Sequence, residues 1–365
     1  MSVSLLGELI REIESTHQRA IRFPRYMEKA LYHPKWGYYS KEQIKLGKKG
    51  DFFTNAHVSD LFGQVLSRFF VNWLKKNQIR SDWTIIEWGA GDGRIAEQFA
   101  RGLLKQGFSP EEISFYLVET SPYHQQLQKE RLSSSPVGFR TVSGLSDIPA
   151  RSFSFIYSNE LVDAFPVHRI KKEQGTFTEA FVTTMNQEPY LKETWLPLSG
   201  DSPIRKQMDR WLGKLKEGQE MEICLAARDW LQEVADWMNH GMLITIDYGG
   251  TEEQLLQKAN TIRAYKAHQV RHDFYSDPGE MDLTYDVNFT HLMEWGRKAG
   301  FTGEQLLTQA QFLIQAGVLN WLPEAPAYDP FSEDAKRVRA IKQLIHPESM
   351  GEAFHVLIQT KSTLW

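Results

Sequence analysis

The chain has 365 residues, of which 41% are hydrophobic and 24% are charged, as in an ordinary globular protein. Its net charge of -4 argues against a general nucleic-acid-binding protein, which normally carries a basic surplus. The single cysteine, Cys224, excludes an internal disulfide and a cysteine-based zinc cluster. The N-terminal stretch contains acidic residues and no long apolar run, so we expect neither a transit peptide nor a membrane span, and a cytoplasmic location.

Helical spacing of apolar residues over 2–20 and again from about Ser59 predicts an N-terminal helical extension over residues 1–80. Beyond it, short apolar runs alternate with helical stretches. Strands are expected over 83–88, 115–118, 139–142 and 153–158, and helices over 94–105 and 123–132. Strands that alternate with helices at this spacing indicate a parallel sheet, so we predict an α/β core over 81–365.

A β-rich insertion interrupts this core at about 165–215. Its first part, 165–198, contains short strand-like pieces separated by turn residues, and a helix is expected over 203–217. Two roles stay open for the insertion, a dimer contact or a surface for a protein substrate. The core pattern then returns, with strands expected over 219–225, 242–246 and 354–359, helices over 229–239 and 289–299, and a polar, loop-rich stretch over 251–290.

A glycine-rich turn, GAGDG (89–93), lies between the strand at 83–88 and the helix at 94–105. Such a turn aims backbone N–H groups at a ligand. Dinucleotide enzymes usually show G-x-G-x-x-G, so the shorter spacing argues against a nicotinamide dehydrogenase and favours S-adenosylmethionine. Glu87, at the end of the strand, is placed to orient the turn or the ligand's ammonium group. The alternative is a tight turn that binds nothing.

A second acid strengthens the cofactor interpretation. Glu119 follows the strand at 115–118, at the position where an acid meets the ribose hydroxyls in nucleotide-binding sheets. A carboxylate accepts two hydroxyl hydrogen bonds, which suits a diol. We therefore predict cofactor contacts from Glu87, Gly89, Ala90, Gly91 and Glu119.

Three polar residues, Asn159, Glu160 and Asp163, follow the predicted strand at 153–158. Ligands of open α/β sheets bind outside the carboxyl ends of the strands, so these side chains are candidates for the methyl-acceptor site. Asp163 comes one helical turn after Glu160, which places both acids on one helix face. Carboxylates suit an arginine acceptor, because guanidinium is planar, stays protonated and pairs with them bidentately. The alternative is that both acids cap a helix.

The stretch 261–289 is rich in acids and contains His268 and His272. The two histidines are four residues apart, but the glutamate of an HExxH motif is missing and Pro278-Gly279 interrupts the context, so we predict no metal site. Long polar loops in compact domains are often functional, which favours a lid or substrate-binding loop over an ordinary solvated loop.

The sequence resembles the MidA-like methyltransferases, a family that includes the mitochondrial arginine methyltransferase needed for complex I assembly. The resemblance runs from about Tyr26 to Leu292. The blocks GDFFT, NELVDAFPVHR and DLTYDVNF are its most specific parts. The full set is HPKWGYYS (33–40), GDFFTNAHVSDLFG (50–63), EWGAGDG (87–93), LVETS (117–121), SNELVDAFPVHR (158–169), IDYGG (246–250) and PGEMDLTYDVNF (278–289).

The resemblance implies a class I methyltransferase with a Rossmann-like sheet and helices on both of its faces, and S-adenosylmethionine as cofactor. It implies that the segment 50–54 approaches the cofactor, which adds Thr54 to the predicted contacts. It also implies that Asn159, Glu160 and Asp163 form the acceptor site.

The chain departs from the family pattern in two places. The family's turn often reads GPGRG, whereas Ala90 and Asp92 stand at its second and fourth positions here. Asn288 stands where relatives often carry aspartate, which puts the family's acceptor in doubt for this chain.

We therefore expect an enzyme that transfers methyl from S-adenosylmethionine to an arginine side chain of a protein. We expect a protein substrate as partner, no nucleic acid and no membrane, and leave a homodimer open. A methyltransferase for a small molecule or another side chain shares every cofactor feature. A third alternative is a non-catalytic assembly factor that retains the fold without binding cofactor.

Overall fold

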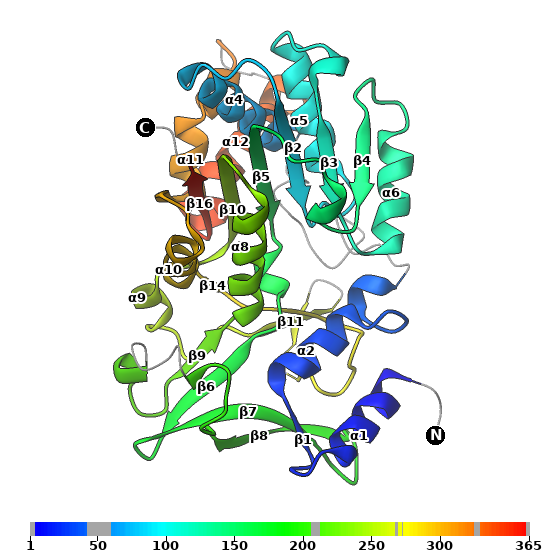
Figure 1. Cartoon of the computed structure of the whole chain (residues 1–365), viewed down its shortest axis with the longest axis vertical. Helices are drawn as coiled ribbons and strands as arrows, with labels where there is room; N and C mark the ends of the chain where they lie inside the picture. The colour runs from blue at the N-terminus through cyan, green and yellow to red at the C-terminus, as the bar shows by residue number, and fades with distance from the viewer. Residues whose placement is uncertain are drawn as a thin grey trace. The chain divides into compact units, whose positions relative to one another are not determined.

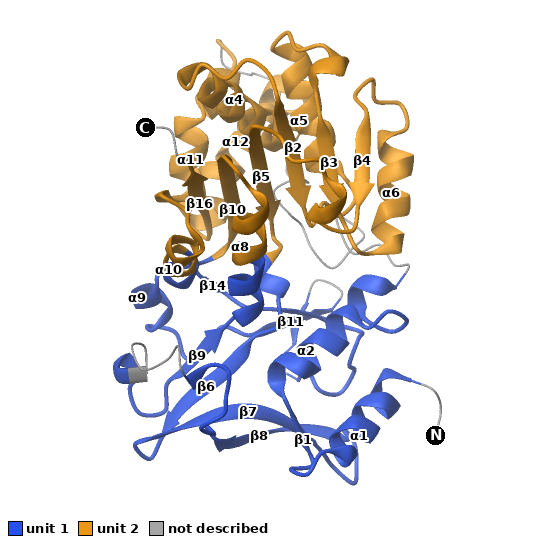
Figure 2. Ribbon diagram, viewed as in Figure 1, with its two compact units in different colours: residues 1–45, 162–230, 249–292 blue, residues 46–161, 231–248, 293–365 orange. Residues whose placement is uncertain are grey.

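The computed structural model describes residues 4–41, 60–205, 212–266, 269–271, 273–324 and 329–362 (Figure 1). The chain divides into two compact units, each assembled from three separate segments (Figure 2). Unit 1 comprises residues 1–45, 162–230 and 249–292, and unit 2 comprises 46–161, 231–248 and 293–365. The domain boundary expected at residue 80 would divide the chain into two continuous segments, and it stays a prediction.

A central sheet organises unit 2. Its main path runs in the order β15-β16-β10-β5-β2-β3-β4. Neighbours are parallel from β4 to β10, whereas β16 is antiparallel to both β10 and β15. The strands are β2 (Trp83–Trp88), β3 (Phe115–Val118), β4 (Phe139–Val142), β5 (Phe153–Asn159), β10 (Gly241–Gly250), β15 (Gly303–Thr308) and β16 (Phe354–Lys361). This confirms the predicted Rossmann-like sheet.

Helices flank this sheet in Figure 1. They are α4 (Leu61–Lys76), α5 (Arg94–Lys105), α6 (Pro122–Leu132), α8 (Leu225–Trp237), α10 (Phe289–Ala299), α11 (Gln309–Gln315) and α12 (Glu333–Ile345). Helices α8 and α10 each begin in unit 1 and end in unit 2. Short helical turns are η2 (Pro110–Glu112), η3 (Leu145–Asp147), η6 (Val318–Trp321) and η7 (Pro347–Gly351). None of the helices in the described ranges is long and apolar enough to cross a membrane.

Aromatic side chains fill the core between the sheet and helices α4 and α5. Phe70, Phe99 and Phe155 are fully buried and lie within 6 Å of one another, measured between ring centroids. Tyr157 stacks on Phe99 with 5.6 Å between centroids. Each large ring buries much apolar surface, so these contacts stabilise the packing of α4 and α5 on β5.

Unit 1 is built around a sheet in the order β1-β7-β6-β9, with β8 paired to β7. Its strands are β1 (Ala20–Arg22), β6 (His168–Glu173), β7 (Thr176–Thr184), β8 (Leu191–Pro197) and β9 (Glu220–Ile223). The strand pieces predicted over 165–198 therefore form β6, β7 and β8. The helices of unit 1 are α1 (Leu5–Ser15), α2 (Phe23–Tyr32) and α9 (Glu252–Leu255), with short turns η1 (Tyr38–Ser40), η4 (Val162–Ala164) and η5 (Leu212–Lys214).

Residues 251–290, expected to be loop-rich, contain more regular structure than the sequence indicated. They hold α9, a three-stranded sheet in the order β12-β11-β13, and β14, which pairs with the last two residues of β10. These strands are β11 (Arg263–Lys266), β12 (Gln269–Arg271), β13 (Asp282–Thr284) and β14 (Val287–Asn288). Each has at most four residues, too short for a readable alternation. Of the helix predicted over 203–217, residues 206–211 lie outside the described residues, and the part after them contains only the short turn η5.

Helices α4 and α5 approach closely at Gly63. A Cβ atom placed on Gly63 would lie 2.6 Å from the Gln98 Cβ and 2.7 Å from the Ile95 carbonyl oxygen. The Gly63 N–H also donates to the Gln98 side-chain oxygen at 3.0 Å. Only hydrogen fits at this helix contact.

We expect Gly63→Val to lower the free energy of unfolding by about 1–3 kcal/mol, because the added methyl groups force the two helices apart. Gly138→Ala is the matched control, since nothing lies within 4 Å of a Cβ at that position. Urea denaturation measures both variants. Equal stability of the two would contradict the close packing.

Candidate functional site

The turn between β2 and α5 has an unusual backbone. Gly89, Gly91 and Gly93 have φ angles of 71°, 52° and 77°, in the left-handed region that glycine enters without penalty. A Cβ on Gly89 would lie 2.7 Å from Leu161 Cδ1. The turn therefore depends on its glycines for both conformation and space, as the motif predicted.

Side chains from β3 and α6 hold this turn. The Gly91 N–H donates to Glu119 Oε2 at 3.0 Å, and the Ser121 N–H donates to Glu119 Oε1 at 2.8 Å. On the other side, the Gln128 amide donates to the Gly91 carbonyl at 2.8 Å. Glu119 is 8% exposed and lies at the carboxyl end of β3, beside the glycine turn. Each of its oxygens retains a second lone pair for a ligand hydroxyl.

The departure at Asp92 has a local explanation. Its carboxylate accepts a hydrogen bond from the Arg131 guanidinium at 2.7 Å and from the Arg94 N–H at 3.1 Å. Arg131 also donates to the Asp92 carbonyl at 3.0 Å. Asp92 thus accepts the first N–H of α5, just before its N-cap Gly93, and joins the turn to α6. Ala90, the other departure, is buried, and its carbonyl accepts the Gly93 N–H at 2.9 Å.

Glu87 points under the turn, into the core. Its carboxyl group is 3% exposed and accepts a hydrogen bond from the Tyr157 phenol at 3.0 Å. Burial raises the pKa of Glu87 well above its usual range, although the hydrogen bonds from Tyr157 and from the Ala96 N–H oppose the shift. A role for Glu87 in orienting the turn agrees with this position, whereas contact with a cofactor ammonium stays a prediction.

Asn159 and Glu160 stand at the carboxyl end of β5. Glu160 has a φ of 52°, a strained conformation for a residue with a side chain. Its Oε1 accepts a hydrogen bond from the Asn159 amide at 2.9 Å. The Asn159 amide therefore orients the Glu160 carboxylate directly after the end of β5.

The expectation that Glu160 and Asp163 share a helix face is wrong. The left-handed Glu160 cannot belong to a right-handed helix, and the short turn η4 begins only at Val162. The chain also passes between Leu161 and Val162 from unit 2 to unit 1. Asn159 and Glu160 thus belong to one unit and Asp163 to the other.

Within unit 1, two of the sequence blocks that carry the resemblance surround Asp163. The Asp163 carbonyl accepts the Tyr285 N–H at 3.1 Å, and the next carbonyl, of Ala164, accepts the Tyr32 hydroxyl at 2.9 Å. Tyr32 stacks on Tyr39 with 5.5 Å between ring centroids. Contacts among HPKWGYYS, SNELVDAFPVHR and DLTYDVNF therefore keep the buried Asp163 in place.

Tyr39 itself is anchored by Asp282. Its hydroxyl donates to both carboxylate oxygens of Asp282, at 2.9 and 3.0 Å. Burial raises the pKa of Tyr39 well above its usual range, and the Asp282 carboxylate adds to the rise. The phenol therefore stays protonated and serves as a hydrogen-bond donor.

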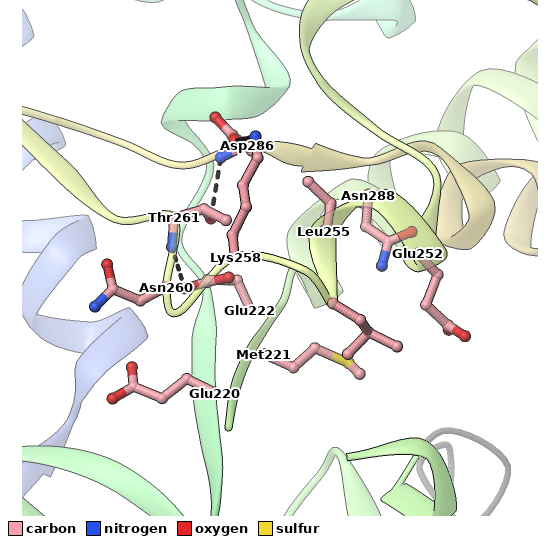
Figure 3. Close-up of a pocket in the computed structure, with 11 residues that line it drawn as sticks. Glu220, Met221, Glu222, Glu252, Leu255, Lys258, Asn260, Thr261, Asp286 and Asn288 are labelled. Atoms are coloured by element: carbon pink, nitrogen blue, oxygen red, sulfur yellow. Dashed lines mark hydrogen bonds and ion pairs between the residues drawn. The ribbon is translucent and has the colours of Figure 1, made fainter. Parts of the chain in front are cut away.

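A small polar pocket lies in unit 1 beside β14 (Figure 3). It has room for about one water molecule. Asp286 in its wall pairs with Lys258 and Arg263, and Glu222 accepts the Thr261 N–H at 3.2 Å. Asp286 and Glu222 are thus paired within the fold, and the pocket is too small for an organic ligand.

Asn288 lies in the wall of the same pocket and precedes α10. Its side-chain oxygen accepts the His291 N–H at 3.2 Å, the geometry of a helix N-cap. Aspartate fills an N-cap position equally well. The departure from the family pattern at Asn288 therefore has a structural explanation that does not involve the methyl acceptor.

Three of the residues that the sequence singled out, Thr54, His268 and His272, lie outside the described residues. Six further residues contact the glycine turn or the ends of β2, β3 and β5. The motifs did not predict them, because none belongs to the glycine motif itself. They are Ser121, Gln128, Arg131, Tyr157, Leu161 and Asp247. Asp247 had a readable signal, an acid at the end of the apolar run 242–246, but it received no role.

A family model of S-adenosyl-L-methionine-dependent methyltransferases matches residues 65–306, more than half of the chain. The chain belongs to this methyltransferase family. It is similar to "Protein arginine methyltransferase NDUFAF7, mitochondrial" from Danio rerio and from Homo sapiens, in both cases with 28% identity over 96% of the chain, and over 85% and 82% of those proteins. A Burkholderia thailandensis structure bound to S-adenosyl-homocysteine is 26% identical, with a TM-score of 0.85 over 98% of this chain and 92% of that one.

The methyltransferase uses S-adenosylmethionine, and the residues at the end of its sheet fit that group. The left-handed glycines leave the turn without side chains, so a ligand can approach its backbone. Glu119 offers carboxylate oxygens for a ribose diol at the end of the neighbouring strand. We expect Gly89, Ala90 and Gly91 to pack against the cofactor and Glu119 to bind its hydroxyls.

We expect Gly91→Val to abolish binding of S-adenosylhomocysteine. A β-branched residue strains a backbone at φ 52° and adds a side chain where the ligand approaches. Isothermal titration calorimetry measures the affinity. Gly144→Ala serves as the control, since a Cβ there meets nothing within 4 Å. An unchanged affinity in Gly91→Val would remove the turn from the cofactor site.

The buried Glu87 should make the free energy of unfolding depend on pH. Its pKa is raised in the folded state, so between the unfolded and folded pKa values the native protein binds the extra proton and stability falls as pH rises. Each pH unit within that window costs up to about 1.4 kcal/mol. Urea denaturation from pH 5 to 8 should show this loss in the wild type and not in Glu87→Gln. Parallel pH profiles for the two proteins would contradict the buried, protonated carboxyl group.

Proposed function

We propose that this methyltransferase transfers methyl to an arginine side chain of a protein. The observation that carries the proposal is the carboxylate of Glu160, which leaves β5 in a left-handed conformation with its Oε1 held by the Asn159 amide. Strained residues held by their surroundings cluster at active sites. This one stands at the carboxyl end of a central strand, next to the strand that carries the glycine turn.

Arginine is the acceptor that this carboxylate suits best. Guanidinium keeps its positive charge in proteins and is a poor nucleophile, because its nitrogen lone pairs are delocalised. A carboxylate bound to two of its N–H groups aligns the plane and concentrates positive charge on the bound nitrogens. The remaining nitrogen then gains nucleophilic character.

When bound, S-adenosylmethionine supplies a methyl group on a positively charged sulfur. Glu160 orients the acceptor nitrogen for in-line attack, which contributes most of the rate acceleration. Methylation would release one proton from the guanidinium group, and Glu160, bound to its N–H groups, is the group that would accept it. Asn159 restricts the carboxylate to one orientation. The sequence-based assignment of Asp163 to the acceptor site stays a prediction.

The relatives support this reading, since they are named protein arginine methyltransferases and match nearly the whole chain. The finer assignment to the MidA-like group rests on the sequence blocks, of which NELVDAFPVHR and DLTYDVNF are joined in the fold by the hydrogen bond from the Tyr285 N–H to the Asp163 carbonyl. A protein substrate follows from arginine as acceptor. A cytoplasmic location and a homodimer stay predictions from the sequence, and the relatives carry the word mitochondrial in their names.

One experiment separates the acceptor classes. The purified protein is incubated with S-adenosylmethionine carrying a tritiated methyl group and a cell extract divided by gel filtration into proteins and small molecules. Label in the proteins that yields methylarginine after acid hydrolysis supports the proposal. Label in other amino acids, or only in small molecules, assigns a different acceptor. Cofactor binding with no transfer to either fraction would favour the non-catalytic assembly factor.

We expect Glu160→Gln to lower the rate of methyl transfer by about a hundredfold, because the amide neither holds guanidinium as strongly nor accepts a proton. The affinity for S-adenosylhomocysteine should stay unchanged, since the cofactor contacts lie on β2 and β3. Single-turnover transfer and calorimetry measure the two quantities. Glu111→Gln, which changes an exposed carboxylate on η2, is the control and should transfer methyl normally. A wild-type rate in Glu160→Gln would exclude Glu160 from catalysis.

A further inference from the structure

The backbone around Glu160 is held from strand β10. The ladder between β5 and β10 ends with Asn159 opposite Ile246. One residue further, the Glu160 N–H still donates to the Ile246 carbonyl at 2.9 Å. The backbone of Glu160 then adopts the left-handed conformation. The N–H of the next residue, Leu161, therefore does not continue the β-ladder with β10.

A buried carboxylate receives that N–H. Asp247 is completely inaccessible to solvent, and its Oδ2 accepts the Leu161 N–H at 3.2 Å. Its Oδ1 accepts the N–H of Tyr248 at 2.9 Å. The two oxygens of one side chain thus bond two backbone segments, the turn after β5 and β10 itself.

This arrangement decides the direction in which the Glu160 side chain leaves the sheet. The N–H groups on both sides of the Glu160 Cα bond to consecutive residues of β10, Ile246 and Asp247. A left-handed residue with a side chain persists only where its surroundings hold it. A hydrogen bond to a buried carboxylate is among the stronger ones that a backbone N–H can make.

We propose that Asp247 is a positioning residue for methyl transfer, which acts by holding the turn that aims the Glu160 carboxylate. It has no direct contact with either reactant in this proposal. The inference rests on the proposed function of Glu160, and it gives a role to the acid of the IDYGG block. Loss of Asp247 misplaces the Glu160 carboxylate, and misplacement by about 1 Å slows an enzyme by up to about a hundredfold.

The nearly isosteric Asp247→Asn tests the proposal. Its single carbonyl oxygen can accept one of the two N–H groups, while its NH₂ group faces the other. We expect transfer of the tritiated methyl group to the extract proteins to slow by about tenfold or more at saturating S-adenosylmethionine. The affinity for S-adenosylhomocysteine, measured by calorimetry, should stay at the wild-type value. Thr245→Val, two residues earlier on β10 and equally buried, is the matched control and should transfer methyl normally.

A double-mutant cycle separates positioning from a general structural effect. If Asp247 acts through Glu160, adding Asp247→Asn to Glu160→Gln should slow transfer no further, whereas a general loss of fold would slow both backgrounds by the same factor. An equal factor in both backgrounds, or a wild-type rate in Asp247→Asn, overturns the positioning role. A wild-type rate in Glu160→Gln alone overturns the proposed function instead, so the two failures are distinguishable.

Hydrogen exchange gives a readout that needs no acceptor. In the wild type, the amide of Leu161 should be protected, and Asp247→Asn should raise its exchange rate while Thr245→Val leaves it unchanged. Mass spectrometry of peptides that cover residues 158–165 measures this. Equal exchange in all three proteins contradicts the hydrogen bond on which the inference depends. If Asp247→Asn fails to fold, Asp247→Ser, which retains one acceptor, takes its place in both experiments.

Discussion

The hydrogen bond from the Gly91 N–H to the Glu119 carboxylate is the contact on which the cofactor side depends. It joins the turn after β2 to the end of β3, and the Gln128 amide secures the same residue from α6. A turn with three left-handed glycines has many alternative conformations in the unfolded chain, so it needs such ties to keep one shape. The carboxylate that holds the turn is the one predicted to bind the ribose hydroxyls, so its structural contacts and the predicted cofactor contact involve the same side chain.

Glu87, Glu119 and Asp247 lie close to the ends of β2, β3 and β10. Their different burial and hydrogen-bond donors give them different roles. Glu87 is buried in the core and accepts a hydrogen bond from the Tyr157 phenol, and its burial raises its pKa. Glu119 accepts hydrogen bonds from two backbone N–H groups and lies at the carboxyl end of β3. Asp247 is the most buried of the three and accepts hydrogen bonds from two backbone N–H groups, which orders the segments that carry them.

The route of the chain between its two compact units matters for the acceptor side. The chain enters unit 1 directly after Glu160 and Leu161, and returns to it within β10 directly after Tyr248. Both crossings therefore occur beside the buried carboxylate of Asp247. The block that begins with Asn159 thus contributes its first residues to unit 2 and Asp163 to unit 1, and the left-handed Glu160 prevents a continuous helix with both acids on one face.

Local patterns in the sequence determined the parallel strands, the glycine turn, helices such as Arg94–Lys105 and the acids at the strand ends, because apolar periodicity and glycine preferences act over a few residues. They also placed Glu160 at the end of its strand. Only the tertiary structure decided that Glu160 is left-handed, that Glu87 faces the core, and that Asp247 bonds the turn after β5. Those outcomes depend on hydrogen bonds between residues as many as 86 positions apart, and no local pattern records such partners.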